Sequence, residues 1–254
     1  GGMGVVYSAY DPRLGREVAL KVVDAAETAE ARLAASLEHP GIVTIHDTGL
    51  LPDGRAFYVM RLLPGHPLDL FIQPDTPLSI RIAIFQKICD AVSFAHSKGV
   101  IHRDLKPANV MAGEFGEISI LDWGIARAAS EKEAARAGTP RFMAPEQAAG
   151  APPAPRADIF SLGALLSFLL PADAPKPLRA IAAKASAANP QDRYASVSEI
   201  SAELGRFLDG FPVEAYRENP IERAARFIRR EKLLLLLIGA YFLTRMVVYF
   251  ISGR

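Results

Sequence analysis

The sequence predicts an α+β fold with two lobes, in which a small antiparallel β lobe precedes a larger helical lobe and a hydrophobic helix follows both. Three short runs rich in β-branched and aromatic residues, bounded by Gly, Pro or Asp, indicate the strands of the small lobe. These runs are residues 4–10, 17–23 and 57–63. Pro64 and Gly65 end the third run and mark a hinge, after which apolar residues recur at helical spacing.

Periodicity and composition predict the remaining elements. One helix is expected inside the small lobe, because the segment is rich in Ala, Glu and Leu, and several more are expected after the hinge. The predicted helices are residues 25–37, 78–98, 156–170 and two between 176 and 209, and residues 117–122 are a predicted strand. We therefore expect a small lobe at 1–63, a large lobe at 64–211, a basic, polar connector at 212–232 and a membrane-spanning helix at 233–251.

Composition limits the class of protein. Half of the 254 residues are hydrophobic, which is enough for a sizeable core in one or two domains. The net charge of +1 argues against a nucleic-acid partner, because binding to phosphate backbones needs clustered excess Lys and Arg. Cys89 is the single cysteine and lies in the apolar pattern of a predicted helix. A buried structural thiol is therefore favoured over a reactive one.

Residues 102–109 and 122–124 carry the strongest chemical signal. The first run reads His-Arg-Asp-Leu-Lys-Pro-Ala-Asn, and thirteen residues after its Asn the second reads Asp-Trp-Gly. Together they supply a carboxylate that can receive a hydroxyl proton, and an amide oxygen and a second carboxylate that can hold Mg²⁺. These are the groups that phosphoryl transfer needs, at the spacing of protein kinases.

Further motifs extend this signal into a resemblance. The chain resembles the eukaryotic-type serine/threonine protein kinases of bacteria over about residues 1 to 209, in motif order and in most of the spacing. The matching segments are Val18-Ala19-Leu20-Lys21, His39-Pro40-Gly41-Ile42-Val43, Ala144-Pro145-Glu146 and Asp158-Ile159-Phe160-Ser161-Leu162-Gly163. The resemblance implies a two-lobed kinase fold, ATP and Mg²⁺ as cofactors, and protein substrates with Ser or Thr hydroxyls.

The resemblance also implies catalytic roles. Asp104 is the expected base, and Lys106 is expected to neutralise charge on the transferring phosphoryl group, as in serine/threonine kinases. Asn109 and Asp122 are the expected Mg²⁺ ligands. Lys21 is expected to hold the α- and β-phosphates.

The family pairs this lysine with a glutamate of the following helix. Family spacing places that glutamate at Glu30, with Glu27 as the competitor one turn earlier.

The expected nucleotide-binding residues come from both lobes. Gly1, Gly2 and Gly4 would let the backbone approach the phosphates, although a glycine cluster alone is equally typical of a tight turn. The adenine is expected to lie between Val6 and Ala19 above and Met111 below. The backbone of Arg61 and Leu63 at the hinge would bond the adenine, and Met60 would limit access behind it.

The chain also departs from the family pattern. It opens inside the glycine-rich motif, so we expect an amino-terminally truncated fragment that lacks the first strand. The connection from Lys21 to Glu30 is short, and a surface helix of the large lobe is missing after Leu170. Arg193 matches the family arginine that pairs with the glutamate at Glu146. The loss of the surface helix puts substrate choice in doubt more than catalysis.

Residues 233–251 form an apolar run of the length that crosses a bilayer. Twelve Leu, Ile, Phe and Val residues contribute about −5 kcal/mol of insertion free energy, which outweighs the roughly +3 kcal/mol of Arg245. A buried core helix is the alternative. The basic residues before the run place the lobes in the cytoplasm, at the inner membrane, by the positive-inside rule. These residues are Arg223, Arg226, Arg229, Arg230 and Lys232, and they could either rest on anionic lipid or form a solvated helix face.

The prediction is a membrane-anchored serine/threonine protein kinase. Its first rival is a pseudokinase, a nucleotide-binding or scaffolding module that acts by association, and its second is a small-molecule phosphotransferase. Intact Lys21, Asp104, Asn109 and Asp122 favour the enzyme, whereas the trimmed helices favour the pseudokinase. A homodimer is left open as an assembly.

Overall fold

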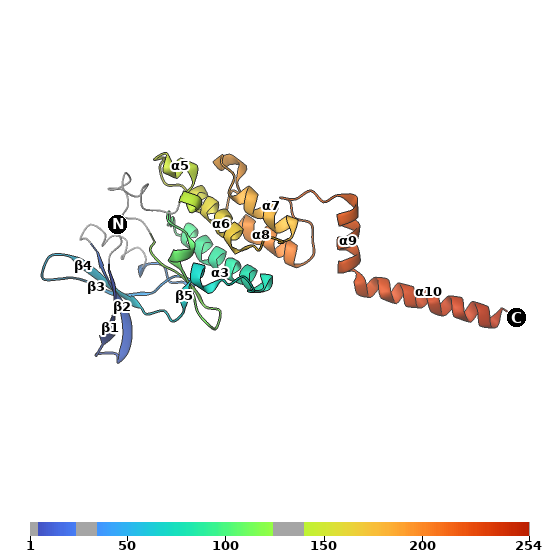
Figure 1. The fold of residues 1–254 in the computed structure, drawn as a ribbon, viewed down its shortest axis with the longest axis horizontal. Coiled ribbons are helices and arrows are strands. Elements are labelled where there is room, and N and C mark those ends of the chain that lie inside the picture. Colours follow the sequence, from blue (N-terminus) through green and yellow to red (C-terminus); the bar gives the residue numbers. More distant parts are fainter. Residues whose placement is uncertain (1–4, 24–34, 124–139, 254) are drawn as a thin grey trace.

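The computed structural model describes residues 5–23, 35–123 and 140–253, and these form two lobes followed by two helices (Figure 1). A β-sheet makes the small lobe, a group of packed helices makes the large lobe, and the last two helices extend away from the large lobe. The predicted α+β, two-lobed architecture is therefore confirmed. The predicted helix 25–37 lies almost entirely outside the described residues.

The small-lobe sheet is antiparallel, with strand order β1-β2-β4-β3. Its strands are β1 (Val6–Asp11), β2 (Arg16–Val23), β3 (Ile45–Leu50) and β4 (Ala56–Arg61). Gly15 has a φ of 64°, and the Asp11 side chain accepts from the backbone N–H groups of Arg13 and Leu14, so this turn joins β1 to β2. Strand β3 was not predicted, because its polar residues show no apolar alternation at the exposed edge of the sheet.

The large lobe is built around α3 and α6, which bury nine of 20 and ten of 15 residues respectively. Its helices are α2 (Leu68–Phe71), α3 (Leu78–Ser97), α5 (Pro145–Ala148), α6 (Pro155–Leu169), α7 (Lys176–Ala185) and α8 (Val197–Leu208). A Cβ on Gly163 would lie 2.5 Å from the backbone N of Ser186, so glycine allows α6 to approach the end of α7 closely. The helices predicted at 78–98, 156–170 and 176–209 are thus present.

A second sheet links the lobes near the hinge. It contains three short antiparallel strands, β5 (His66–Pro67), β6 (Val110–Ala112) and β7 (Ile118–Ile120), and β7 confirms the strand predicted at 117–122. Ile42 bridges to Ile120, so the segment just before β3 is tied to the same sheet. Cys89 on α3 is fully buried, and burial raises the pKa of its thiol, as expected for a structural cysteine.

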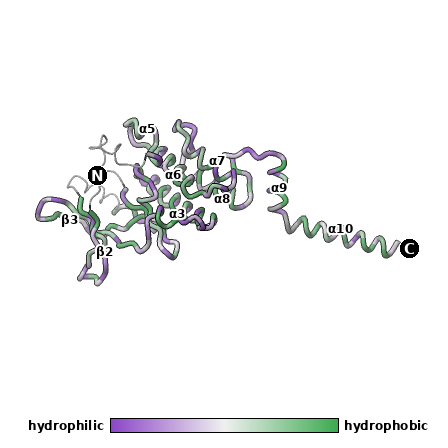
Figure 2. Tube along the Cα trace, viewed as in Figure 1, coloured by the Kyte–Doolittle hydropathy of each residue, from purple (hydrophilic) through white to green (hydrophobic). Residues whose placement is uncertain are grey.

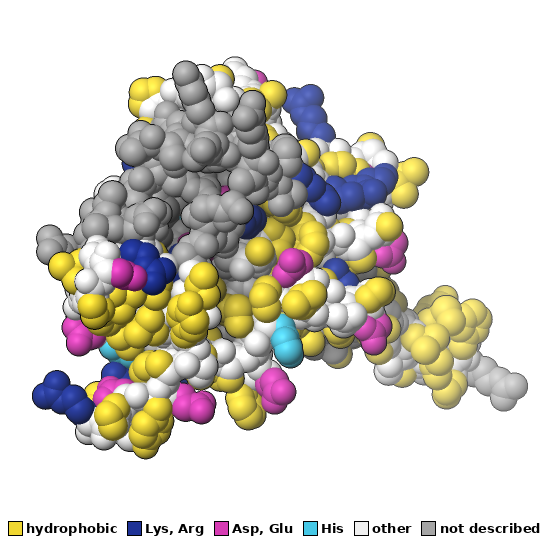
Figure 3. Space-filling view, turned by 60° about the vertical axis from the view of Figure 1, so that its left-hand side comes forward, with side chains coloured by type: hydrophobic (Ala, Val, Ile, Leu, Met, Phe, Trp, Pro, Cys, Tyr) yellow, Lys and Arg dark blue, Asp and Glu magenta, His cyan; other side chains and the backbone are white. Residues whose placement is uncertain are grey.

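Two helices follow α8 instead of the polar connector and single helix that the sequence predicts. The connector contains α9 (Pro220–Arg230), which begins with a capping box in which Asn219 and Glu222 bond each other's backbone N–H groups. Helix α10 (Lys232–Ser252) follows and covers the predicted span. Within the described part of the chain, α10 is the one helix long and apolar enough to cross a membrane, over Leu235–Ser252, and none of that window is buried (Figures 2 and 3).

Candidate active site

The loop after α3 brings three predicted catalytic residues together. Asp104 Oδ2 accepts hydrogen bonds from Lys106 Nζ at 2.9 Å and from Asn109 Nδ2 at 3.1 Å. Asn109 Nδ2 also donates to the backbone oxygen of Asp104 at 2.8 Å. The Asp104 side chain is 16% exposed, so it meets solvent while its neighbours hold its direction. The carboxylate is therefore fixed at the mouth of the site.

Asp158 on α6 holds this loop in place through hydrogen bonds. It is fully buried and accepts from the backbone N–H of His102 and of Arg103, each at 2.8 Å, and it lies 2.8 Å from His96 Nε2. Arg103 itself has a φ of 69°, a left-handed conformation that these bonds help to hold. The sequence placed Asp158 only on a buried helix, so its role in supporting the catalytic loop was missed.

Asp122 is tied to the same loop through Leu121. The Leu121 N–H donates to Asn109 O at 2.8 Å, and His102 Nε2 lies 2.9 Å from Leu121 O. Asp122 follows with a φ of 51°, which turns its carboxylate out of the strand direction. The base and the expected metal ligands are consequently held by one hydrogen-bonded unit.

Trp123 anchors the end of this unit. The indole is 1% exposed, donates from Nε1 to Ile120 O at 3.3 Å and lies 4.8 Å from the His102 ring between centroids. Burial lowers the pKa of His102 below its ordinary value of 6.5 despite the nearby carboxylates. A neutral His102 can therefore bond on both sides, to Leu121 O and from the Asp104 N–H.

Lys21 reaches this unit from the small lobe. Its ammonium pairs directly with Asp122 Oδ1 and lies 5.8 Å from the centre of the Tyr58 ring. Burial lowers the pKa of Lys21, but the Asp122 carboxylate and the Tyr58 hydroxyl outweigh it, so the pKa is raised above 10.5. The lysine is thus held as a cation between the lobes, where phosphate oxygens would also be attracted.

Strand register places several residues that are expected to contact the nucleotide on one face of the small-lobe sheet. Val6 on β1 and Tyr58 on β4 both face Lys21 on β2, and Met60 faces Ala19. Opposed side chains of neighbouring strands lie on the same face, and residues two apart share it. Four predicted residues therefore meet there, with Val6 about half exposed and Ala19, Lys21 and Met60 buried.

Tyr58 is the residue of this face that the sequence analysis missed. It is 4% exposed, belongs to the small-lobe core and contacts Lys21. Its position two residues before Met60 was the available signal, because alternation puts both side chains on one face.

The hinge residues lie beside a separate cavity of about 390 Å³. Arg61, Leu63 and Met111 line it together with His39 and Asp90, but Ala19 and Lys21 do not. The cavity thus adjoins α3 on the side of the hinge away from Lys21. Leu63 also packs on the small-lobe core, as a hinge residue between the two sides would.

Several predicted residues lie outside the described part of the chain. Gly1, Gly2 and Gly4 of the expected phosphate loop and Glu30, with its competitor Glu27, are among them. Their roles stay predictions.

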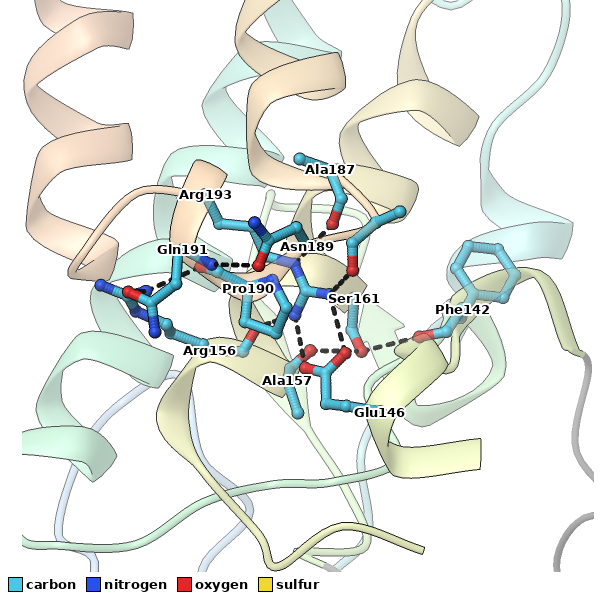
Figure 4. Close-up of polar contacts among 11 residues, drawn as sticks. Phe142, Glu146, Arg156, Ala157, Ser161, Ala187, Asn189, Pro190, Gln191 and Arg193 are labelled. Carbon is cyan, nitrogen blue, oxygen red and sulfur yellow. Dashed lines mark hydrogen bonds and ion pairs between the residues drawn. The ribbon is translucent and has the colours of Figure 1, made fainter. Parts of the chain in front are cut away.

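The Glu146–Arg193 ion pair links α5 to the core of the large lobe (Figure 4). Arg193 bonds both carboxylate oxygens of Glu146, at 2.6 and 2.8 Å, and donates further to backbone oxygens of Arg156, Ala187 and Ala188. These bonds to Arg193 lower the pKa of Glu146. The pairing expected from the sequence is therefore present, and it satisfies a guanidinium whose side chain is fully buried.

Asn109 and Asp122 are suited to Mg²⁺. The Asn109 amide nitrogen is bonded to Asp104, so its amide oxygen is the end that can bind a cation, and the Asp122 side chain is 28% exposed. In the part of the chain that the structure describes, no cluster of three or more His, Cys, Asp or Glu forms a metal cage. Mg²⁺ does not need one, because it keeps several waters and shares phosphate oxygens in nucleotide sites. The donor set therefore fits the ion.

The fold and this site define the class of protein. A model of the protein kinase domain matches residues 1–222, and the chain belongs to this family. The chain is 32% identical over 284 residues to the serine/threonine-protein kinase PknD of Chlamydia pneumoniae, covering 84% of this chain and 30% of that protein.

Two further relatives are kinases named PknB. The chain is 35% identical over 260 residues to PknB of Mycolicibacterium smegmatis, covering 83% of this chain and 42% of that protein. It is 34% identical over 265 residues to PknB of Mycobacterium tuberculosis, with 85% and 42% covered. The chain thus spans less than half the length of these relatives.

Proposed function

We propose that the chain is a membrane-anchored serine/threonine protein kinase that transfers the γ-phosphoryl group of ATP to protein hydroxyls. The observation that carries this proposal is the bonded unit of Asp104, Lys106, Asn109 and Asp122, reached from the other lobe by Lys21. Relatives named as serine/threonine-protein kinases support the activity.

Asp104 is the group that receives the proton of the substrate hydroxyl. Lys106 donates from Nζ to Asp104 Oδ2 at 2.9 Å, and its ammonium can shift toward negative charge that develops on the phosphoryl oxygens. Because Asn109 bonds both Oδ2 and the backbone oxygen of Asp104, the base keeps its direction while Lys106 moves.

Lys21 orients the nucleotide phosphates from the small lobe. It pairs with Asp122 in this structure, and that contact places its ammonium beside the expected metal ligand. Mg²⁺, when bound, would supply positive charge that draws the phosphate oxygens to Asn109 and Asp122. Positioning and charge stabilisation would account for most of the catalysis, since the protein contributes no covalent step.

The membrane anchor is α10. Its described large apolar side chains are 37% to 75% exposed, which is unfavourable in water and favourable in lipid. The basic residues that precede it favour cytoplasmic lobes at the inner membrane, where protein substrates and ATP are found together.

Transfer of radiolabelled γ-phosphate to a generic basic protein tests the activity. The full chain reconstituted in vesicles is compared with Asp104→Asn, which removes the base but keeps the shape of the side chain. We expect transfer by the first and a loss of at least about a thousandfold in the second. Equal labelling by both would contradict the proposal.

The same preparation separates the enzyme from a pseudokinase. Absence of transfer, together with nucleotide-dependent thermal stabilisation of the unmodified chain, would favour the nucleotide-binding scaffold. Alkaline washing of the vesicles tests the anchor, and extraction of the intact chain by alkali would contradict a membrane span.

A further inference from the structure

Helix α9 has an apolar face that the large lobe does not cover. Ile221, Phe227 and Ile228 are 80%, 53% and 57% exposed, and Ala224 between them is exposed as well. Spacings of three and four residues place Ala224, Phe227 and Ile228 along one side of the helix, with the exposed Arg223 beside Phe227. Ile221, at the start of α9, also lines the cavity between this helix and the lobe. A row of this kind on a helix needs a cover other than water.

The other side of α9 is attached to the lobe by polar contacts. Glu222 pairs with Lys176 at 2.7 Å and accepts from the Tyr216 hydroxyl at 2.9 Å, and Arg226 Nη1 donates to Gly210 O at 3.1 Å. The pKa of Glu222 is lowered to about 2, chiefly by its hydrogen bond from Lys176.

Packing between α9 and the lobe is incomplete. Arg230 lies 4.6 Å above the Phe211 ring, and a cavity of about 630 Å³ separates α9 from the ends of α7 and α8. The lobe therefore fixes which way α9 faces without burying its apolar residues.

The bend between α9 and α10 shows where the uncovered face points. Helix α10 leaves the end of α9 on the side away from the lobes, so α9 lies between the large lobe and the direction that α10 takes (Figure 1). Figure 2 shows the change from a mixed α9 to an apolar α10 across this bend. If α10 crosses a bilayer, the outer face of α9 meets the bilayer surface at the point where α10 enters it.

We infer that α9 is an interfacial helix that lies on an anionic membrane surface, with Phe227 and Ile228 among the lipid chains and Arg223 at the headgroups. This inference rests on the membrane anchoring proposed above. It divides the basic cluster: Arg226 bonds Gly210 and Arg230 stacks on Phe211 on the lobe side, whereas Arg223 faces lipid. The large lobe is then held beside the membrane through α9 and cannot swing freely on α10.

Nitroxide labelling of single cysteines tests this placement in the full chain. Cys89 is fully buried and its thiol pKa is raised, so it should stay unlabelled in Ile228→Cys, Phe242→Cys and Phe115→Cys variants. Phe115 is 91% exposed in the turn between β6 and β7 and serves as the aqueous control. Each variant is placed in vesicles of phosphatidylcholine with or without phosphatidylglycerol.

Collisions with oxygen, which concentrates in lipid, are compared with collisions with a water-soluble nickel chelate. We expect the Ile228→Cys label in anionic vesicles to collide often with oxygen and rarely with the nickel chelate. Burial under protein would make collisions with both rare. Adding Arg223→Gln should lower the ratio of inserted to detached α9 about fivefold, the factor that corresponds to about 1 kcal/mol for one basic residue at the surface.

Three results would overturn the inference, and they differ in what else they affect. Nickel access at position 228 equal to that at 115, with position 242 shielded, would refute the interfacial helix and leave the anchor intact. Nickel access at 242 would refute the anchor and the inference with it. Equal shielding at 228 in neutral and anionic vesicles, unchanged by Arg223→Gln, would refute the role of anionic headgroups.

Discussion

The two lobes hold their functional groups in different ways. In the large lobe, Asp104 and Asn109 are fixed by hydrogen bonds within one loop, and Asp158 fixes that loop from a fully buried helix. Among the residues of the small lobe that the structure describes, the core cluster has six buried members, and Lys21 is held by a carboxylate of the other lobe and by Tyr58. The large lobe therefore positions its functional groups through its own hydrogen bonds. The small lobe depends on a contact with the other lobe to position Lys21.

This difference predicts two kinds of mutant. A substitution that removes a buried bond of the large lobe should lower stability first and activity as a consequence. A substitution on the nucleotide face of the small lobe should change phosphate positioning while the fold keeps most of its stability.

Lys21→Met and Asp122→Asn break the contact between the lobes. Each should lower phosphoryl transfer by at least about a thousandfold, because both groups position or neutralise the phosphates, while the midpoint of thermal unfolding changes little. Lys98→Met, at an exposed lysine just after α3, is the matched control and should keep full activity. Full activity in either site variant would contradict the kinase proposal.

Arg193→Ala removes the buried partner of Glu146 in the large lobe. We expect a loss of about 3 kcal/mol in the free energy of unfolding, because a carboxylate and several backbone oxygens lose their donor. The control is Arg206→Ala, whose ion pair with Glu214 is exposed and should contribute less than about 1 kcal/mol. Denaturant unfolding measures both, and equal losses would remove the distinction between buried and exposed pairs.

Sequence reasoning recovers the parts of the site that lie close together in the chain. The loop from His102 to Asn109 was predicted as a unit because its roles are fixed by short spacing, and α3, α6, α7 and α8 were predicted because their apolar residues recur with a helical period. Local patterns were sufficient for these elements.

Contacts between distant segments were harder to predict. Asp158 supports the catalytic loop 55 and 56 residues away, and nothing in its own helix indicates that partner. Helix α9 was missed because its charged composition resembles a linker, although Asn219 and Glu222 give the signal of a helix start. Glu30 and the amino-terminal glycines stay predictions.

His102 should make the large lobe sensitive to mild acid. Its ring is buried with a pKa below 6.5, so the unfolded chain binds a proton at a higher pH than the folded chain does. This group contributes no pH dependence above pH 6.5, and its contribution to stability falls as the pH drops from 6.5 toward its lowered folded value. Stability should therefore rise with pH across that window.

Denaturant unfolding of the original chain and of His102→Gln at several pH values measures this effect. We expect the slope below pH 6.5 to decrease in the variant. His46→Gln is the control: the pKa of His46 is also lowered, first by partial burial and then by Arg16, but its ring is exposed on β3 and should matter less. An unchanged slope in His102→Gln would show that other groups cause the acid sensitivity.

The smallest expected effect is that of Tyr58→Phe, and it tests the small lobe alone. The variant keeps the ring, 5.8 Å from Lys21 Nζ, and the packing of the core, but loses the hydroxyl that helps to raise the pKa of Lys21. A hydrogen bond to a charged group contributes about 1.5–3 kcal/mol, and Asp122 holds the same ammonium, so the loss should be at the lower end.

We therefore expect KM for ATP to rise by roughly tenfold in Tyr58→Phe, with little change in kcat or in the unfolding midpoint. Tyr58→Leu removes the ring as well and should raise KM further while it also lowers stability, because the side chain is 4% exposed and belongs to the small-lobe core. Tyr10→Phe, at a tyrosine that is 65% exposed on β1, controls for the loss of a hydroxyl elsewhere in the sheet. If both Tyr58 variants lose stability in parallel and leave KM unchanged, Tyr58 is a packing residue only. Lys21 is then positioned by the large lobe, and the small lobe contributes the strand that carries it.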